Sequence, residues 1–164
     1  MPPTLTILPF TDALAPVFRD INAAWIRNMF VLEPHDEHVL GHPRRAIIDP
    51  GGVILFVRSS EHGVVGTGAL MPTGDGGYEL TKMGVTAATR GTGAGAALLD
   101  ALIAHARKLP DIRLLYLLTS RKCAAAVHLY EKAGFVHDAD IMARFGALYA
   151  RCDVAMRYPL EIRT

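Results

Sequence analysis

A glycine-rich stretch, Arg90-Gly-Thr-Gly-Ala-Gly95, carries the clearest chemical signal in this sequence. It lies between a predicted strand and a predicted helix, where free backbone N–H groups and the positive end of the helix dipole meet. Glycine lets the main chain approach an anion closely, and Arg90 can add a charged contact to a diphosphate. The stretch therefore predicts a phosphate site, although a purely structural turn has the same composition.

Two other phosphate-binding motifs fit this stretch less well. A Walker loop ends in Gly-Lys-Ser or Gly-Lys-Thr, whereas Gly95 is followed by two alanines. A dinucleotide loop reads Gly-x-Gly-x-x-Gly after the first strand of a parallel sheet, and an acidic residue ends the next strand. Here the pattern is Gly-x-Gly-x-Gly, and Asp111 precedes the next predicted strand. The spacing disfavours nucleoside triphosphate hydrolysis and nicotinamide-dependent oxidation.

Three histidines and one cysteine raise other chemistry. His35, His38 and His42 stand at helical spacing beside acidic residues, as metal ligands do, but a glycine and a proline interrupt a regular helix there. We therefore expect no metal. Cys123, at the predicted start of a helix, could attack a thioester, although such a residue is more often buried and inert.

Hydropathy periodicity predicts the elements that position these residues. Alternating or continuous apolar runs predict strands at residues 4–8, 53–58, 64–71, 78–85, 114–119, 135–136 and 152–158. Apolar spacings of three and four predict helices at residues 12–29 and 36–41, from the glycine stretch to 108, and at 122–133. Short turns join the middle strands into a meander, and the glycine stretch with its helix forms a βαβ unit. We predict a single-domain α/β (α+β) fold over residues 1–164, with a mixed, mostly antiparallel central sheet flanked by helices.

Composition and charge exclude several classes of function. Lys and Arg number 17 and Asp and Glu number 16, so the formal net charge is +1 and electrostatics nominates neither nucleic acid nor membrane as a partner. Two cysteines cannot build a disulfide framework. The first residues lack the pattern of a signal peptide, and no apolar run is long enough for a membrane span. We expect a cytoplasmic protein.

Two segments together resemble a known family. Val85-Thr-Ala-Ala-Thr-Arg-Gly-Thr-Gly-Ala-Gly95, followed by a Leu-Leu helix, resembles the Arg/Gln-x-x-Gly-x-Gly/Ala loop of the GCN5-related N-acetyltransferase (GNAT) family. Ala126-Val-His-Leu-Tyr-Glu-Lys-Ala-Gly-Phe135 resembles the family's helix ending in Leu-Tyr-Glu-Lys-x-Gly-Phe. Both stand in the family's order with one apolar strand between them. The resemblance covers residues 78–136, and the other predicted elements fit the family's order.

The resemblance implies where acetyl-CoA binds as the acyl donor. The strand ending at Met83 to Val85 would hydrogen-bond the pantetheine arm through its backbone. Ala87 replaces a proline common in relatives, and Ser120 replaces a common asparagine, which weakens a side-chain contact to pantetheine there. The implied cofactor-binding residues are Met83, Val85, Arg90, Gly91, Gly93, Ala94, Gly95, Ala96, Ser120 and Tyr130, those from Arg90 to Ala96 holding the diphosphate with backbone N–H groups.

The resemblance also implies two catalytic residues. Tyr130 stands where the family's tyrosine points at the coenzyme sulfur, and it would protonate the leaving thiolate. The alternative is a core aromatic residue. Glu79 is the candidate base, acting through water, against an ordinary solvated strand residue or an acid from the first helical region. Period-two alternation places Lys82 on the face opposite Glu79, as a surface or cofactor-side charge.

The acceptor site is implied to lie at the loop after the first long helix. Glu33 and Asp36 could recognise a cationic amine and Trp25 and Phe30 could wall it, against the alternative of a solvated acidic turn. We expect a small amine acceptor and an N-acetyltransferase, the runner-up being a non-catalytic acyl-CoA-binding or sensing module. The sequence does not settle the oligomeric state, for which a homodimer is the commonest arrangement.

Overall fold

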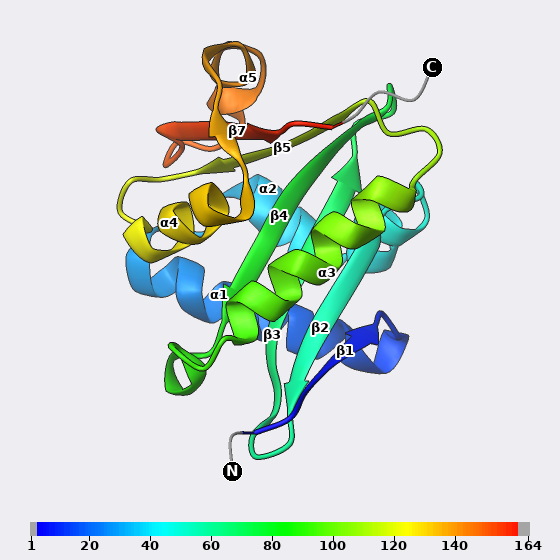
Figure 1. The fold of residues 1–164 in the computed structure, drawn as a ribbon, viewed down its shortest axis with the longest axis vertical. Helices are drawn as coiled ribbons and strands as arrows, with labels where there is room; N and C mark the ends of the chain where they lie inside the picture. The colour runs from blue at the N-terminus through cyan, green and yellow to red at the C-terminus, as the bar shows by residue number, and fades with distance from the viewer. Residues whose placement is uncertain (1–2, 161–164) are drawn as a thin grey trace.

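Seven strands form one mixed sheet in the computed structural model, which describes residues 3–160 (Figure 1). The strands are β1 (Leu5–Pro9), β2 (Val53–Ser59), β3 (Gly63–Pro72), β4 (Gly77–Val85), β5 (Leu114–Thr119), β6 (Val136–His137) and β7 (Val154–Tyr158). The helices are α1 (Ala15–Met29), α2 (Pro34–Gly41), α3 (Ala94–Lys108), α4 (Ala124–Ala133) and α5 (Ala139–Phe145). Short helical turns are η1 (Asp12–Leu14), η2 (Arg44–Ile48), η3 (Ala87–Thr89) and η4 (Gly146–Leu148).

The sheet has the strand order β1-β2-β3-β4-β5-β7-β6. Short turns join β2, β3 and β4 into an antiparallel meander, as the sequence predicts. The single parallel pair in the described sheet is β4 with β5, which are joined by α3. This is the crossover that a parallel pair requires. The predicted fold class is therefore confirmed.

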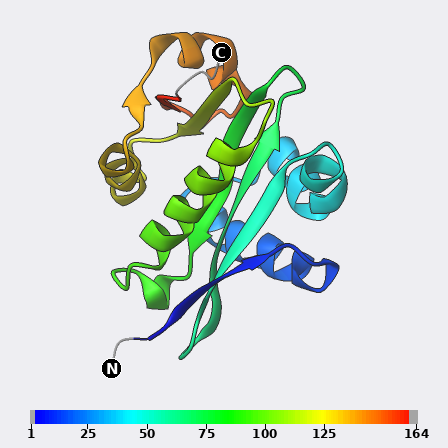
Figure 2. The same ribbon diagram turned by 45° about the vertical axis from the view of Figure 1, so that its right-hand side comes forward.

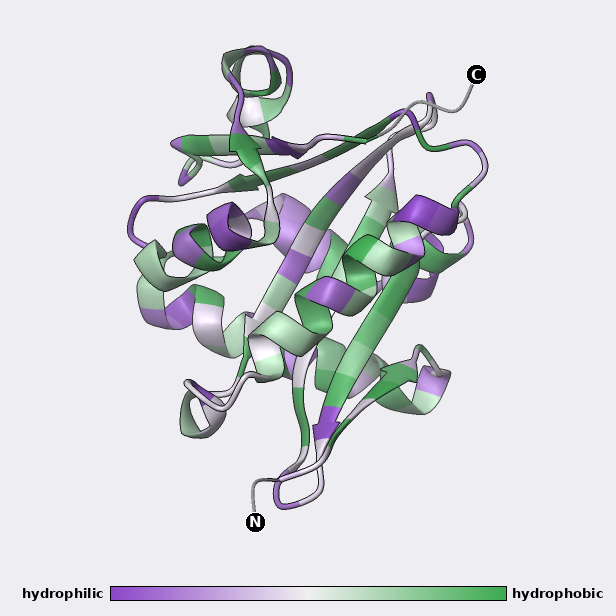
Figure 3. Ribbon diagram, viewed as in Figure 1, coloured by the Kyte–Doolittle hydropathy of each residue, from purple (hydrophilic) through white to green (hydrophobic). Residues whose placement is uncertain are grey.

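Helices cover both faces of the sheet (Figure 2). Alternate residues of each central strand point to opposite sides, so Leu80 and Leu117 pack in the core under α3 and α4. Tyr116 points to the other face, where it packs with Ile141 of α5. A second core lies between the sheet and the helices α1 and α2. Apolar residues run along β2 in Figure 3, because this strand is covered on both sides.

Two helix ends follow from glycine. Gly93 adopts a left-handed conformation with φ +85° directly before α3, and Gly134 does so with φ +111° directly after α4. Phe135 then packs edge to face against Tyr130, which closes α4 with the predicted hydrophobic contact. Both glycines lie where the sequence pattern required them.

Two features differ from the sequence predictions. Helix α5 was not expected, although Asp138 caps it by accepting hydrogen bonds from Asp140 N and Ile141 N at 2.8 and 3.1 Å. Helix α2 begins at Pro34, two residues earlier than predicted, because Glu33 and Asp36 form a capping box at its start. No helix among residues 3–160 is long and apolar enough to span a membrane.

Candidate active site

A cleft opens where the two parallel strands separate. β4 and β5 pair only from Gly77 with Leu114 to Leu80 with Leu117, and beyond that point they diverge, as Figure 1 shows. The free space between them is lined by the ends of both strands and by residues of α1, α4 and the segment before β7. Beyond Leu80 the edge of β4 that faces β5 has no strand beside it, so its backbone can bind a ligand.

A β-bulge lies in β4 at the mouth of this cleft. The register passes from Thr67 with Gly84 to Ala69 with Thr81, so Lys82 and Met83 stand opposite Gly68 alone. Lys82 has φ +52° and is the one residue other than glycine with positive φ in the described chain. The bulge interrupts the strict alternation of the strand at Lys82.

Lys82 is consequently placed differently from the sequence prediction. Its side chain is on the same side of the sheet as Glu79 and Thr81, and it is almost fully buried. Nζ of Lys82 donates to Asp36 Oδ1 at 2.9 Å and to the Tyr149 hydroxyl at 3.1 Å. The predicted surface position on the face opposite Glu79 is wrong, because the extra bulge residue shifts the side chain across the strand; Lys82 lines the cleft instead.

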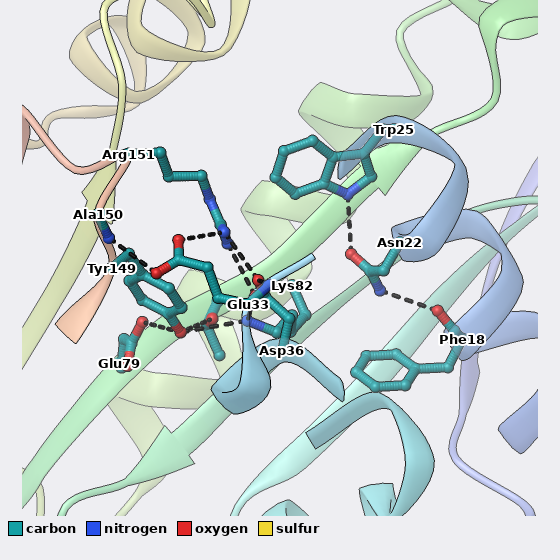
Figure 4. Close-up of polar contacts among 11 residues, drawn as sticks. Phe18, Asn22, Trp25, Glu33, Asp36, Glu79, Lys82, Tyr149, Ala150 and Arg151 are labelled. Carbon is teal, nitrogen blue, oxygen red and sulfur yellow. Dashed lines mark hydrogen bonds and ion pairs between the residues drawn. The ribbon is translucent and has the colours of Figure 1, made fainter. Parts of the chain in front are cut away.

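Asp36 is the centre of a buried ion-pair cluster (Figure 4). Besides Lys82, it binds both terminal nitrogens of Arg151 at 2.8 Å. Arg151 Nη1 also donates to Glu33 Oε2 at 3.0 Å, and Ala150 N donates to Glu33 Oε1 at 2.9 Å. These contacts fasten the segment before β7 to the start of α2.

The hydroxyl of Tyr149 links this cluster to Glu79. It donates to Glu79 Oε2 at 3.3 Å and lies 3.5 Å from Thr81 Oγ1. Tyr149 lines the cleft, whereas Glu79 lies behind it and is only 2% exposed. Glu79 is therefore not a solvated strand residue, and its connection to the cleft runs through Tyr149.

Burial shifts the titration of these groups. Loss of solvent raises the pKa of Glu79, against the opposing effect of Lys82, and lowers the pKa of Lys82, against the opposing effect of Asp36. Burial alone would raise the pKa of Asp36, but hydrogen bonds from Arg151 and the charge of Lys82 hold it well below its usual range. Asp36 is ionised at neutral pH, and Glu79 is the more readily protonated carboxylate.

The glycine loop has the geometry of an anion site. The first bond of α3 runs from Ala97 N–H to Gly93 C=O, so the N–H groups of Ala94, Gly95 and Ala96 have no backbone partner. A Cβ at Gly91 or Gly93 would meet no atom within 4 Å, so the outer side of the loop is open. Arg90 is exposed and takes part in no ion pair of the described chain. The loop therefore has free donors at the positive end of α3, which fits a diphosphate.

The far wall of the cleft comes from β5 and α4. Tyr130, Ser120 and Cys123 line it together. Burial raises the pKa of Tyr130, with a further rise from neighbouring Cys123, so its hydroxyl is protonated at neutral pH. Burial likewise raises the pKa of the Cys123 thiol, which makes a thiolate nucleophile unfavourable there. Tyr130 packs in the core and also reaches the cleft.

The near wall is aromatic. Trp25 and Phe30, at the end of α1, both line the cleft. The indole of Trp25 covers Gly84 so closely that a Cβ there would lie 2.4 Å from the ring. Its Nε1 donates to Asn22 at 2.9 Å, which fixes the ring (Figure 4). The aromatic walls predicted from the sequence are both at the cleft.

Apart from Val85 and the glycine-loop residues from Arg90 to Ala96, the predicted site residues divide into two groups. Met83, Ser120, Tyr130, Trp25 and Phe30 meet at the cleft, whereas Glu33 and Asp36 face Arg151 and Glu79 lies behind Tyr149. Sequence reasoning missed Tyr149 and Arg151 as lining residues and misplaced Lys82. Only Lys82 had a local signal, a charged residue in an otherwise buried strand.

The three histidines do not converge on a site. His35 packs against the Tyr149 ring, while His38 and His42 lie 5.5 Å apart by ring centroids. Between residues 3 and 160 no three His, Cys, Asp or Glu side chains are grouped as metal ligands.

Comparisons with known proteins match the same part of the chain. A family model described as an acetyltransferase (GNAT) domain matches residues 51–137, a span that contains the bulge, the glycine loop and α4. Comparison with curated proteins gives no match.

Solved structures resemble nearly the whole chain. An acetyltransferase of the GNAT family from Staphylococcus aureus Mu50 has a TM-score of 0.84 at 20% identity, covering 96% of this chain and 100% of its own. The yncA protein of Salmonella typhimurium, solved with its cofactor acetyl-CoA, has a TM-score of 0.72 at 20% identity, covering 98% and 96%. A SpeG spermidine N-acetyltransferase variant from Vibrio cholerae has a TM-score of 0.68 at 18% identity, covering 93% and 92%. At these identities the likeness concerns the fold.

Proposed function

Because the chain belongs to the GNAT acetyltransferase family, we propose that it is an acetyl-CoA-dependent N-acetyltransferase that acts on a primary amine of a small molecule or amino acid. The observation that carries this proposal is the cleft between β4 and β5, which has free backbone donors on one side and Tyr130 on the other. The whole chain, residues 1–164, would be one N-acetyltransferase domain.

The acyl donor would lie along β4 and end at the glycine loop. The backbone of Met83 and Val85 would bind the pantetheine arm, because this edge of β4 has no neighbouring strand. The diphosphate would accept hydrogen bonds from the N–H groups of the loop, and Arg90 would add a charged contact. Ser120 and Tyr130 would border the thioester from the opposite wall.

Acetyl transfer by direct attack needs three proton movements, the first of which converts the acceptor ammonium to a neutral amine. The neutral nitrogen then forms a bond to the thioester carbonyl carbon, the C–S bond breaks, and the thiolate takes a proton from the Tyr130 hydroxyl. The Tyr130 phenolate regains a proton from the attacking nitrogen, which leaves a neutral amide. Backbone N–H groups at the bulge would stabilise the charge on the carbonyl oxygen. Burial of Tyr130, which keeps its hydroxyl protonated, supports the role of acid.

Glu79 would take the proton of the acceptor ammonium. Its raised pKa suits a base working near neutral pH, and the hydroxyl of Tyr149 connects it to the cleft at 3.3 Å. Trp25 and Phe30 would wall the acceptor, while Glu33 and Asp36 would act by holding Arg151. The proposed reaction requires no metal. The free thiols of Cys123 and Cys152 support a cytoplasmic location, where cysteines stay reduced.

The experiment starts with acetyl-CoA binding by calorimetry and then follows thiol release with amino acids, polyamines, aminoglycosides and short peptides. Acceptor-dependent release supports the transferase, and absence of binding refutes the proposal. Tight binding with no release by any acceptor favours the second candidate, a non-catalytic acyl-CoA-binding module that would use the same loop. Mass measurement of the enzyme before and after donor addition checks for direct attack, since acetylated Cys123 would contradict it.

Tyr130→Phe tests the acid. We expect kcat to fall by roughly 100-fold, the lower range for loss of a general acid, while the Kd for acetyl-CoA changes less than about twofold. Tyr158→Phe is the control, because this tyrosine also packs against Phe135 but is outside the cleft lining. Equal kcat values for the wild type and Tyr130→Phe would show that Tyr130 is not the general acid.

A further inference from the structure

The charges that line the cleft are all of one sign. Lys82 and Arg151 are its charged lining residues among the described part of the chain, and both are cationic. The acidic residues nearby, Glu33, Asp36 and Glu79, are not among the lining residues and bind protein donors. An acceptor in the cleft therefore contacts hydrogen-bond donors of Lys82 and Arg151 rather than carboxylates, so a group with acceptor oxygens fits them better than a second cation does.

Arg151 keeps a pair of unused donors. Asp36 takes one hydrogen from each terminal nitrogen, and Glu33 takes the second hydrogen of Nη1. Because the guanidinium has five N–H groups, the Nε hydrogen and the second hydrogen of Nη2 remain. These two hydrogens lie side by side on one edge of the planar group, which is the arrangement that binds the two oxygens of a carboxylate.

The free edge of Arg151 is not completely buried. In the described chain, His35 Nε2 is the one buried side-chain nitrogen or oxygen without a hydrogen-bond partner. Nε of Arg151 has no hydrogen-bond partner either and is not among these atoms, so it keeps some contact with solvent. The exposed fraction of the whole side chain is nevertheless only 13%, and Arg151 lines the cleft.

Neighbouring groups hold the guanidinium in place. Its carbon lies 4.6 Å from the centre of the Tyr149 ring and 5.8 Å from that of Phe30. Together with the contacts to Asp36 and Glu33, these rings fix the plane of the group before any ligand arrives. A fixed fork loses little conformational freedom on binding, so it favours a ligand with matching geometry.

We propose that the acceptor is a small amine that also carries a carboxylate, and that the free edge of Arg151 binds this carboxylate in the cleft. This inference rests on the proposed N-acetyltransferase function and narrows its substrate class. Amino acids belong to the class, and polyamines do not.

Matched acceptors test the proposal. L-leucine and 3-methylbutylamine, and L-phenylalanine and 2-phenylethylamine, differ only by a carboxylate, and kcat/KM for each is measured by thiol release. We expect the amino acid of each pair to be preferred by roughly 10- to 100-fold, the range for hydrogen bonds to a charged group. Preference for the plain amines or for spermidine would overturn the proposal. Preference for phosphoethanolamine over the amino acids would also overturn it, because the anionic group of the acceptor would then be a phosphate and not a carboxylate.

The members of each pair also differ in the pKa of their amino groups, which by itself can change the rate. Arg151→Lys separates this effect from binding of the carboxylate, because the variant does not alter the acceptors. Lysine keeps the charge but lacks the fork, so the preference for the amino acid over its amine should fall by about tenfold or more. Arg44→Lys, in an exposed ion pair with Asp12, is the matched control and should keep the preference. An equal loss of kcat/KM with both acceptors would assign Arg151 a structural role and refute the proposal.

A binding experiment distinguishes failure of the transferase function from failure of the carboxylate site. If acetyl-CoA binds but no acceptor releases thiol, the transferase function fails. L-leucine and 3-methylbutylamine are then titrated into the CoA-loaded protein by calorimetry. Binding of L-leucine alone would support the carboxylate site, and equal or absent binding of both would refute it.

Discussion

Replacing Asp36 with asparagine tests whether the buried cluster holds the acceptor end of the cleft together. Asn keeps the size of the side chain but removes the charge that pairs with Lys82 and Arg151. The Asp36 side chain is 0% exposed and that of Lys82 2%, so solvent cannot replace the lost carboxylate. Breaking such a buried pair by removing one partner costs about 3–5 kcal/mol.

This loss is large for a domain of this size. Typical unfolding free energies are about 5–15 kcal/mol, so Asp36→Asn should remove roughly a fifth or more of the total. At about 2–4 °C per kcal/mol, the midpoint of thermal unfolding should fall by roughly 6–20 °C. Urea unfolding followed by fluorescence of Trp25, the single tryptophan, measures the free energy. Glu37→Gln, at the next and exposed residue of α2, is the control and should change it by less than about 0.5 kcal/mol.

The same variant has a pH signature. Because the folded pKa of Asp36 lies below its ordinary value of 3.8, its contribution is fully present above that pH and is lost as the pH falls through the folded pKa. The difference in unfolding free energy between wild type and Asp36→Asn should therefore be constant near neutral pH and shrink below about pH 4. A difference under about 1 kcal/mol at pH 7 would refute the argument that the cluster is a tightly coupled buried unit.

Two further predictions concern the base and the glycine loop. Glu79→Gln should flatten the rise of kcat/KM with increasing pH, because the group that must lose a proton before it can act as base is gone; an unchanged pH profile would exclude Glu79. Gly93→Ala should weaken acetyl-CoA binding about tenfold by calorimetry, because φ +85° costs alanine about 1–2 kcal/mol and the loop will move. Gly51→Ala is the control: this glycine, at φ +108° in a turn before β2, also has positive φ, and its substitution should leave acetyl-CoA affinity unchanged. Equal affinities in the two variants would contradict the role of the glycine loop in binding acetyl-CoA.

The fold was predictable because its signals are local. Strand and helix periodicity, the turns between β2, β3 and β4, and the glycines that flank α3 and α4 each depend on residues close together in the sequence. Helix α5 is not predicted from the sequence pattern, because it has only seven residues and only Ile141 among them is buried. Its capping residue, Asp138, is a signal for the start of a helix. A single capping residue without an apolar stripe behind it is rarely enough to predict a helix.

The candidate site was only partly predictable because its main contacts are long-range. Lys82 meets Asp36 across 46 residues and Tyr149 across 67, and Arg151 meets Asp36 across 115. No local pattern links such positions. The alternation rule also fails at Lys82, since a bulge adds one residue to β4, and only the glycine opposite it at Gly68 marks the place in the sequence.

The acidic loop illustrates how ion pairs within the protein can withdraw carboxylates from the surface that a ligand contacts. In the sequence, Glu33 and Asp36 suggest a surface that attracts cations. In the fold, both carboxylates bind Arg151, and Asp36 also binds Lys82, so their oxygens are directed to the protein. The carboxylates oppose the loss of charge that burial imposes on Lys82 and hold Arg151 in place, and the unused hydrogens of Arg151 remain for the ligand. The acids are thus a reason to expect an anionic group on the acceptor, since without them a buried arginine would be neither oriented nor stable in this cleft.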